Sequence, residues 1–535
     1  MARAAGSLVS FERRSPVRDR RASRRGYRIA AIDVGTNSIH MIIAEQQKHG
    51  YRVIDKEKEM VQLGRDSLEG RPLSADAIAR GVTTLSTMTA IARRWEVDEV
   101  VAVATSAIRE APNRRRFLGA VERAAGVKVR VISGEEEADY IYRAVRSAVE
   151  FHGGTALSVD IGGGSVELIV GTNAEVFFTQ SVPLGALRMA QKFELEAAAD
   201  AAAVKAARSY VRKTLKKVMG PIVSLGFDFT VGTSGTILTL ATIAANGSSN
   251  DERFASGLRW LSRSRLEELI EELAPLSAAE RSSRFGIDAN RGGTILAGAI
   301  VLAEVMAVVK TEQIRACDVA LREGIVESRL DQGSQRRRGL NGSVRRTSVM
   351  ALAERSDVDM VHASHVATLA LRIFDQTAAL HMLRTGEREL LEYATLLHEV
   401  GMHVSYQSHH KHSYYLISHA GLRGFTADQV AVVASVARYH RKSPPKDDHP
   451  NFAQLSPGRR AVVRKLSAIL RLAVALDRGR QGAVRDIAVA CDETAVVFKI
   501  RKRGEAKLEH EAAMKKGKYF GELFEREVRF LVTSR

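Results

Sequence analysis

Residues 31–44 read AIDVGTNSIHMIIA, and residues 158–171, which begin 127 positions further along the chain, read SVDIGGGSVELIVG. Both segments follow one pattern: an apolar run that ends in an aspartate, a glycine-containing turn, a serine and a second apolar run. The pattern predicts a β-hairpin whose turn presents backbone N–H groups and hydroxyls beside a carboxylate. One such hairpin could be an ordinary turn, but the repeat predicts two related domains that face each other across a cleft.

The segments after the first hairpin alternate between helical and strand patterns. Apolar residues recur at helical spacing within 78–91 and 138–148, whereas 100–104 and 127–132 have the composition of strands. Strands that alternate with helices after an opening hairpin predict an α/β sheet that is covered by helices.

The composition is that of a globular protein with several domains. The chain has 535 residues, of which 45% are hydrophobic and 27% are charged, and this is more than one ordinary core uses. The formal net charge of +18 favours polyanionic partners, such as nucleic acid, an anionic membrane surface or a polyphosphate. Eight arginines within residues 1–25 contribute to this excess, and we expect a solvated, disordered tail there.

Targeting and membrane signals are weak. The tail lacks the apolar segment of a secretory signal, and the apolar stretch 295–309 is interrupted by Glu304 and too short to span a bilayer. Cys317 and Cys491 lie far apart and predict neither a disulfide framework nor a metal site. We therefore expect a cytoplasmic protein that does not associate with a membrane.

The C-terminal part of the chain differs in character. Residues 331–347 are polar, basic and glycine-containing, which is typical of a linker. Eleven of the fifteen histidines then lie between His362 and His449, in a region with helical apolar spacing, and paired strands are predicted from about residue 481. These changes divide the chain into a basic tail (1–26), a first lobe (27–152), a second lobe (153–330), the linker (331–347), a helical domain (348–480) and a small α/β C-terminal domain (481–535).

Six segments, in this order, resemble one known family: AIDVGTNSIHMIIA, ATSAIREAPN, ISGEEEA, DIGGGSVELIVG, PLGALRM and GTSGTI. They are similar to segments of the exopolyphosphatase / guanosine pentaphosphate phosphatase (Ppx/GppA) family, and HHKHSYYLI from residue 409 resembles the family's helical C-terminal extension. The resemblance implies a duplicated ribonuclease-H-like (actin-like ATPase) core in two lobes, dependence on magnesium, and hydrolysis of terminal phosphates. A homodimer is implied by the resemblance only.

The candidate phosphate-binding residues lie in turns after strands. Glycine lets several N–H donors converge on one anion, and hydroxyls and guanidinium groups add further donors. The candidates are Asp33, Gly35, Thr36, Asn37 and Ser38 in the first turn; Gly162, Gly163, Gly164 and Ser165 in the second; Thr105, Ser106 and Arg109; Gly232, Thr233, Ser234 and Gly235; and, as a weaker candidate, Arg188. The turn at 232–235 could instead face a guanosine.

Acidic residues beside the turns are candidates for the metal and the water. Asp160 and Glu167 bracket the second turn and could reach a magnesium ion, whereas His40 stands where the first hairpin would have the equivalent of Glu167. Three glutamates follow one another at 135–137, and the second of them, Glu136, has the spacing of a capping box with Ser133. Glu137 matches the family's catalytic glutamate, so the resemblance implies that it activates the attacking water.

The histidine-rich region resembles the HD-type metal phosphohydrolases in its ligand order, with His362, His398 beside Glu399, and Asp477. Glutamate stands where those enzymes have aspartate, and the extra methylene displaces the carboxylate. We therefore expect an HD-like domain without a working metal centre. The run 409–412 is interpreted as a partly charged basic lining for a long polyanion.

Three functions remain open on the sequence. The first is magnesium-assisted removal of terminal phosphates from polyphosphate, favoured by the basic body and the long extension, with guanosine pentaphosphate as the alternative substrate. The second is an ATP-binding kinase or chaperone-type ATPase. The third is a sensor that binds polyphosphate or a guanosine alarmone without hydrolysing it. No specific nucleic-acid partner is predicted.

Overall fold

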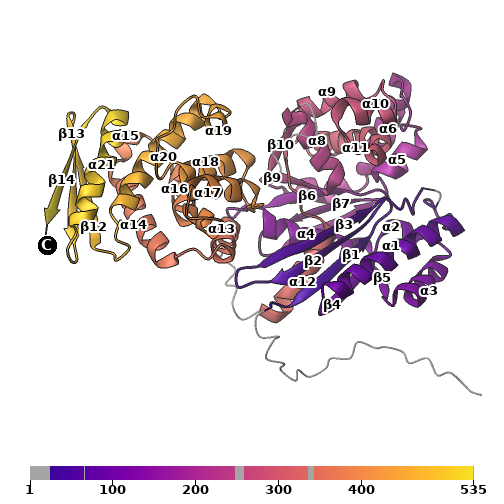
Figure 1. The fold of residues 1–535 in the computed structure, drawn as a ribbon. Coiled ribbons are helices and arrows are strands. Elements are labelled where there is room, and N and C mark those ends of the chain that lie inside the picture. Colours follow the sequence, from indigo (N-terminus) through magenta and orange to yellow (C-terminus); the bar gives the residue numbers. More distant parts are fainter. Residues whose placement is uncertain (1–24, 66, 247–257, 335–342, 534–535) are drawn as a thin grey trace, which may run out of the picture.

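The computed structural model describes residues 25–65, 67–246, 258–334 and 343–533. Figure 1 shows two lobes, one above the other, with a helical region and a small sheet beside them. Residues 1–24 of the predicted tail and the centre of the predicted linker lie outside the described residues. Both ends of that linker are helical, because one helix runs to Ser334 and the next begins at Val344.

The first lobe is built on a five-stranded sheet with the order β3-β2-β1-β4-β5. Its strands are β1 (Arg28–Val34), β2 (Ile39–Gln46), β3 (Tyr51–Glu59), β4 (Glu99–Ala104) and β5 (Val129–Val131). Its helices are α1 (Ala75–Arg94), α2 (Ser106–Glu110), α3 (Arg114–Ala125) and α4 (Gly134–Ala148). Strands β1 to β3 are antiparallel, whereas β4 and β5 continue the sheet in parallel with β1.

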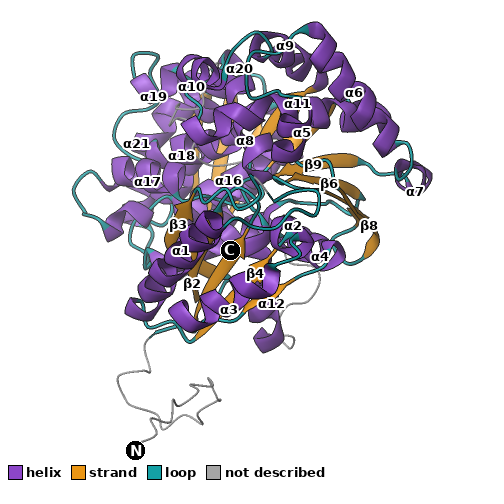
Figure 2. Ribbon diagram, turned by 90° about the vertical axis from the view of Figure 1, so that its right-hand side faces the viewer, coloured by secondary structure: helices purple, strands orange, loops and turns teal. Residues whose placement is uncertain are grey.

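The second lobe repeats this topology and adds one edge strand. Its sheet has the order β10-β11-β9-β6-β7-β8, so that β8-β7-β6-β9-β11 corresponds to β3-β2-β1-β4-β5. The strands are β6 (Ala156–Ile161), β7 (Val166–Gly171), β8 (Val176–Val182), β9 (Phe229–Thr233), β10 (Arg259–Ser262) and β11 (Gln313–Ala316). The helices are α5 (Ala186–Lys192), α6 (Ala201–Leu215), α7 (Met219–Leu225), α8 (Ser234–Asn246), α9 (Arg263–Leu273), α10 (Ala278–Phe285) and α11 (Ala289–Val308). Helices pack around the strands of both lobes (Figure 2).

Helix α11 is the apolar stretch noted in the sequence. It is long and apolar enough to cross a membrane, but 78% of its apolar window is buried inside the protein. Its only described carboxylate, Glu304, is 1% exposed and accepts hydrogen bonds from Arg208 and Arg212. The apolar composition of α11 is therefore that of a core helix.

Helix α12 (Leu321–Ser334) corrects the predicted boundary at residue 330. It follows the second sheet in the chain but packs on α4 and β1 of the first lobe, as Figure 1 shows. Its buried residues Leu321, Ile325 and Val326 share one core with Ile29 of the first sheet and Val231 of the second. The apolar side chains of α12 are buried in this shared core, and they thereby help to hold the two lobes together.

The C-terminal region is one domain rather than two. Its helices are α13 (Val344–Arg355), α14 (Met360–Gln376), α15 (Ala378–His381), α16 (Thr385–Leu397), η3 (Val400–His403), α17 (His409–His419), α18 (Ala427–Arg438), α19 (Pro450–Ala453), α20 (Pro457–Ala475) and α21 (Lys507–Phe524). Strands β12 (Val484–Cys491), β13 (Ala495–Lys502) and β14 (Glu527–Thr533) form the order β12-β13-β14.

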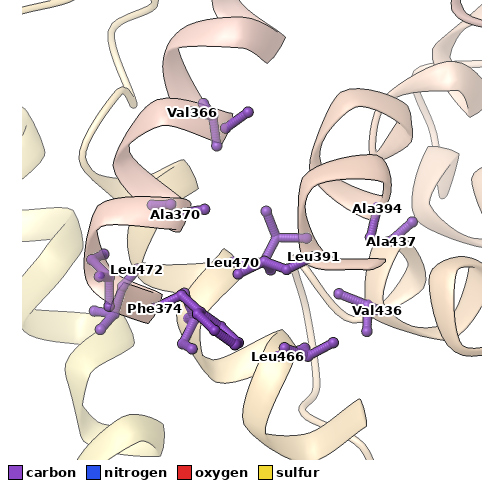
Figure 3. Packing of buried hydrophobic residues seen from close by; sticks show 14 of the residues in the cluster. Val366, Ala370, Phe374, Leu391, Ala394, Val436, Ala437, Leu466, Leu470 and Leu472 are labelled. Atoms are coloured by element: carbon purple, nitrogen blue, oxygen red, sulfur yellow. The ribbon is translucent and has the colours of Figure 1, made fainter. Parts of the chain in front are cut away.

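One hydrophobic core joins the helices to this sheet. Figure 3 shows part of it, where Phe374, Leu391 and Leu466 converge from three helices. The same core includes Phe498 and Phe530 of the C-terminal sheet. The predicted division at residue 480 is therefore not a domain boundary, because β12 packs on α14 and α21 packs on α20.

Candidate active site

The two predicted glycine turns have the same backbone geometry. The N–H of Gly35 donates to the carbonyl of Ser38 across 3.1 Å, and the N–H of Gly162 donates to that of Ser165 across 3.0 Å. Strand pairing continues this equivalence, because Asp33 lies opposite His40 and Asp160 lies opposite Glu167. The duplication in the sequence is thus a duplication of structure.

Both turns face a single cavity of about 330 Å³ between the lobes. They also touch: a Cβ added to Gly164 would lie 2.4 Å from Oγ of Ser106 and 3.0 Å from Oγ1 of Thr36. Glycine at position 164 is therefore required for the close approach of the second turn to the first lobe. The predicted residues that line the cavity are Asp33, Gly35, Thr36, Asn37, Ser38, Thr105, Ser106, Glu137, Asp160, Gly162, Gly163, Gly164, Ser165, Ser234 and Gly235.

Four carboxyl groups lie at or beside this cavity: Asp33, Glu137 and Asp160 line it, whereas Glu167, which lies opposite Asp160 in the hairpin, does not. Burial raises the pKa of Asp160 to about 6, and burial together with Asp160 raises the pKa of Glu167 to about 7. Burial also raises the pKa of Asp33 to about 7 against the opposing charge of Arg322. For Glu137, burial and then the charge of Glu167 hold the pKa well above its usual range. Burial therefore outweighs the opposing charges of Arg109 and Arg322, and the pKa values of these carboxyl groups stay raised.

Two of these carboxylates have an oxygen without a partner. Oδ1 of Asp33 and Oε2 of Glu167 are buried and have no hydrogen-bond partner among the described residues. Oε1 of Glu167 accepts from the hydroxyl of Ser181 at 2.8 Å, and Oδ2 of Asp160 accepts from Thr233. Buried and unpartnered carboxylate oxygens are costly unless a ligand satisfies them.

Glu137 differs from its two acidic neighbours in its burial. The predicted capping box at the start of α4 is confirmed, with N–H to side-chain bonds of 3.1 Å in both directions between Ser133 and Glu136. Glu135 and Glu136 are exposed, whereas Glu137, one position further round the helix, is 8% exposed and points into the site. Of the three glutamates in the first turn of α4, only Glu137 therefore lines the cavity.

Some predicted phosphate ligands have other partners. Arg109 donates from Nη1 to Glu137 Oε2 at 3.0 Å and to the carbonyl of Ile132 at 2.9 Å, and it does not line the cavity. Arg188 donates to the carbonyl of Gly164 at 2.8 Å and pairs with Glu110 at 2.6 Å, so it supports the second turn.

The turn after β9 is only partly exposed to the cavity. Gly232 and Thr233 do not line it, because they belong to the strand, and the hydroxyl of Thr233 is directed to Asp160. Ser234 and Gly235 do line it at the start of α8. Ser234 has a φ of 83° and a buried hydroxyl without a partner among the described residues. Backbone strain of this kind is found where a ligand is held.

Three charged residues that line the cavity were not predicted from the sequence. Arg291 lies in the first turn of α11, and Asp318 and Arg322 lie at the junction of β11 and α12. The charge of Arg322 lowers the pKa of Asp33 and of Asp160. A usable signal existed, since β11 runs parallel to β9 and the residues after parallel strands meet at one edge of the sheet.

A second, larger cavity adjoins the first. It has a volume of about 830 Å³ and shares Asp318 and Val319 with the first cavity. It lies between the first lobe and the helical domain. Its lining includes six lysines and arginines and three acidic residues: Arg52, Lys56, Arg143, Arg146, Arg355 and Arg423, with Asp318, Glu323 and Glu327. The excess of positive charge suits a polyanion that extends out of the first cavity.

The HD-like residues lie together in the helical domain, far in the chain from this site. His362, His398 and Glu399 each place one potential ligand atom within 4.8 Å of the others. Asp477 is not part of this group, because its oxygens accept from Nδ1 of His362 at 2.7 Å and from the N–H of Gly482 at 3.0 Å.

The prediction of a charged histidine lining at 409–412 is wrong for its first two residues. His409 and His410 are buried, and burial lowers the pKa of both, that of His410 to about 4. They are therefore neutral near pH 7 and contribute no charge to hold a polyanion.

Comparisons with known proteins agree with this arrangement. Residues 42–333 match the Ppx/GppA phosphatase family, and residues 344–514 match domain III of that family. The guanosine-5'-triphosphate,3'-diphosphate pyrophosphatase of Vibrio parahaemolyticus is 28% identical over 459 residues, 84% of this chain and 87% of that protein. The protein of the same name from Aeromonas hydrophila is 29% identical over 474 residues, 88% of this chain and 91% of its own length.

Solved structures of related proteins resemble a little more than half of this chain. The Ppx/GppA family member of Aquifex aeolicus superposes with a TM-score of 0.51 and 29% identity, covering 58% of this chain and 99% of that one. An exopolyphosphatase from Cytophaga hutchinsonii gives a TM-score of 0.54 and 27% identity, covering 57% and 98%. The chain belongs to the Ppx/GppA phosphatase family and is a hydrolase that acts on phosphoric anhydrides.

Proposed function

We propose that this protein removes terminal phosphates from inorganic polyphosphate by magnesium-assisted attack of water, in a cleft of the actin-like ATPase type. The observation that carries the proposal is the meeting of the two glycine turns on one cavity that Glu137 also lines. A terminal phosphate in this cavity would lie between the turns, with backbone N–H groups on both sides of it.

Several groups are suited to hold the phosphate oxygens. Besides the N–H groups of the turns, the hydroxyls of Thr36, Ser38 and Ser165 line the cavity, and Arg322 adds a fixed positive charge. Phosphoryl transfer depends mainly on positioning and on stabilisation of charge at the equatorial oxygens, which donors of this kind provide. Arg322 would thus bind phosphate oxygens from the start of α12.

The carboxylates fit a magnesium ion. Asp33, Asp160 and Glu167 offer hard oxygen ligands, and two of their oxygens are buried without partners among the described residues. Within the described residues, no three of these carboxylates have ligand atoms within 4.8 Å of one another. Mg²⁺ does not need three, because it retains several waters and binds through one or two carboxylates and the substrate phosphate. When bound, the ion would neutralise charge on the phosphate and on the carboxylates.

Glu137 would act as the general base. Its pKa is raised by burial and by Glu167, and a base works best when its pKa approaches the working pH. Arg109 holds one carboxylate oxygen at 3.0 Å and so orients the group. The other oxygen is available to take a proton from a water molecule in the cavity.

The basic second cavity favours polyphosphate over a compact substrate. Because Asp318 and Val319 line both cavities, the second lies next to the first, and we infer that a chain whose end is bound between the turns continues into it. Guanosine pentaphosphate is the second candidate. Relatives that match 84% and 88% of this chain carry a name for hydrolysis of that nucleotide, and the Ser234–Gly235 turn could face its guanosine.

The test is phosphate release from long-chain polyphosphate and from guanosine pentaphosphate in parallel, with magnesium and with a chelator. We expect release from polyphosphate that requires magnesium and that falls by about 100-fold or more in Glu137→Gln. Glu135→Gln is the matched control, since this exposed residue lies two positions earlier on the same helix. Faster turnover of guanosine pentaphosphate would select the alternative, and inactivity toward both substrates would refute the proposal.

A further inference from the structure

A cluster of imidazoles and one carboxylate is buried in the helical domain, away from the phosphate site. It contains His362 on α14, His398 and Glu399 after α16, His409 at the start of α17 and His440 after α18. The four histidines are at most 4% exposed. Their rings are adjacent, with centroid separations of 5.7 Å for His362 and His398, and 4.9 Å for His398 and His440.

Hydrogen bonds fix the tautomer of three of these rings. In each, Nδ1 lies beside an oxygen that can only accept: Asp477 Oδ2 at 2.7 Å from His362, the carbonyl of Thr395 at 2.6 Å from His398, and the carbonyl of Ala437 at 2.6 Å from His440. Nδ1 must therefore carry the proton, which leaves a lone pair on Nε2. Histidines that bind metals show this arrangement, with the second nitrogen donating to a carboxylate or carbonyl.

The Nε2 atoms have few protein partners. Nε2 of His398 is buried and has no hydrogen-bond partner among the described residues. Nε2 of His362 lies 4.0 Å from Oε2 of Glu399, and Nε2 of His440 lies 3.3 Å from Nε2 of His409. Lone pairs that converge in a buried space are unfavourable unless a cation or a proton lies between them.

Positive charges border the cluster without filling it. Arg480 donates to Oε1 of Glu399 and leaves Oε2 directed toward His362. Arg441 lies 3.0 Å from Nδ1 and 3.3 Å from Nε2 of His409. Because Nδ1 carries the proton in His398 and in His440, each of these rings presents the lone pair of Nε2, as metal binding requires.

We propose that the helical domain binds one divalent transition-metal ion through Nε2 of His362, Nε2 of His398 and the carboxylate of Glu399, with His440 beside them. Imidazole-rich sites favour ions such as Zn²⁺ or Co²⁺ over Mg²⁺, which prefers oxygen. The site is therefore chemically distinct from the carboxylate site between the lobes.

Only a small movement would close the site around such an ion. Two ligands about 2.0–2.1 Å from a tetrahedral ion lie about 3.3 Å apart, and Nε2 of His362 is 4.0 Å from Oε2 of Glu399. The extra methylene of Glu399 thus does not remove its carboxylate from the histidines. Asp477 supports His362 rather than acting as a ligand, which is a change from its predicted role.

The experiment uses the full-length protein, freed of metal and then titrated with Co²⁺, whose visible absorption reports nitrogen and oxygen ligands. We expect one equivalent to bind, to be displaced by Zn²⁺, and to raise the melting temperature. His398→Ala and Glu399→Gln should each weaken binding by about 10-fold or more. His419→Ala is the control, because His419 also bonds a carbonyl through Nδ1, at 2.8 Å, but is exposed.

The outcomes separate this site from the magnesium site. Glu167→Gln should leave the Co²⁺ spectrum and its stoichiometry unchanged. If the wild-type protein binds no stoichiometric Co²⁺ or Zn²⁺, or if Glu399→Gln and His398→Ala, both folded by circular dichroism, bind as the wild type does, the proposal is wrong. An effect of His419→Ala equal to that of His398→Ala would likewise refute it.

Discussion

Arg109 and Glu137 are 28 residues apart in the chain, yet Nη1 of the arginine donates to Oε2 of the glutamate across 3.0 Å. Arg109 lies on α2, after β4, and Glu137 lies in the first turn of α4, after β5. Because β4 and β5 are adjacent and parallel, the helices that follow them begin side by side. The parallel arrangement of β4 and β5 thus brings the guanidinium of Arg109 to the carboxylate of Glu137, which it orients.

Replacing Arg109 should therefore alter the pH dependence of the enzyme. The charge of Arg109 lowers the pKa of Glu137, against burial and Glu167, which raise it. In Arg109→Ala that pKa should rise further, and the acidic limb of the kcat/KM profile should move to higher pH by about one unit or more. Arg109→Lys should shift it less, and Arg115→Ala, at an exposed position nearby, should not shift it. Identical profiles for Arg109→Ala and the wild type would show that the pair does not act in the reaction.

The carboxylates around the cavity predict the pH dependence of stability. Asp33 and Glu167 have pKa values of about 7, and Asp160 has one of about 6, all above the unfolded values. Between about pH 4 and pH 7 the folded state therefore holds more protons than the unfolded state. The free energy of unfolding should fall as the pH rises through this range, because each carboxyl group must lose its proton in a buried position. Each group can contribute up to about 1.4 kcal/mol per pH unit.

Metal-free protein should consequently melt at a lower temperature at pH 8 than at pH 5.5, and magnesium should raise the melting temperature more at pH 8. Calorimetry or fluorescence with and without a chelator measures both. Asp160→Asn should reduce this difference, whereas Asp139→Asn, which breaks a half-buried ion pair with Arg143 away from the cavity between the lobes, should not. A melting temperature that rises steadily from pH 5.5 to pH 8 in the chelator would contradict the raised pKa values.

Gly164→Ala should separate the two turns. The added methyl group would lie within 2.4 Å of the hydroxyl of Ser106, so the lobes must shift apart at the site. We expect a loss of activity of at least about 10-fold and a destabilisation of about 1–3 kcal/mol. Gly220→Ala is the control, because nothing lies within 4 Å of its added Cβ. Wild-type activity in Gly164→Ala would show that contact between the turns is dispensable.

The basic second cavity predicts a dependence on chain length. The double variant Lys56→Ala and Arg355→Ala removes two exposed cations from its lining. We expect KM for long polyphosphate to rise about 3- to 10-fold, with little change for a short chain that occupies only the first cavity. Lys48→Ala combined with Lys217→Ala removes the same charge from exposed positions outside both cavities. Equal effects of the two double variants would mean that only net charge matters.

The sequence by itself determined the features that depend on local pattern. The repeat with Asp33 and Asp160 predicted two hairpins, because alternation of strand, glycine turn and strand is encoded within a dozen residues. The capping box at Ser133 and Glu136 likewise fixed the start of α4 and with it the face on which Glu137 lies. Family resemblance then supplied the role proposed for that residue.

Only the tertiary structure decided which side chains meet. It placed α12 on the first lobe and brought Arg322 to the carboxylates. It also paired Arg109 with Glu137 and brought potential ligand atoms of His362 and His398 within 4.8 Å of each other. None of these contacts has a local signature, because each joins residues whose distance is set by strand order and helix packing. Burial, which shifts the pKa values and leaves oxygens and nitrogens without partners, is a property of the assembled core and not of any segment.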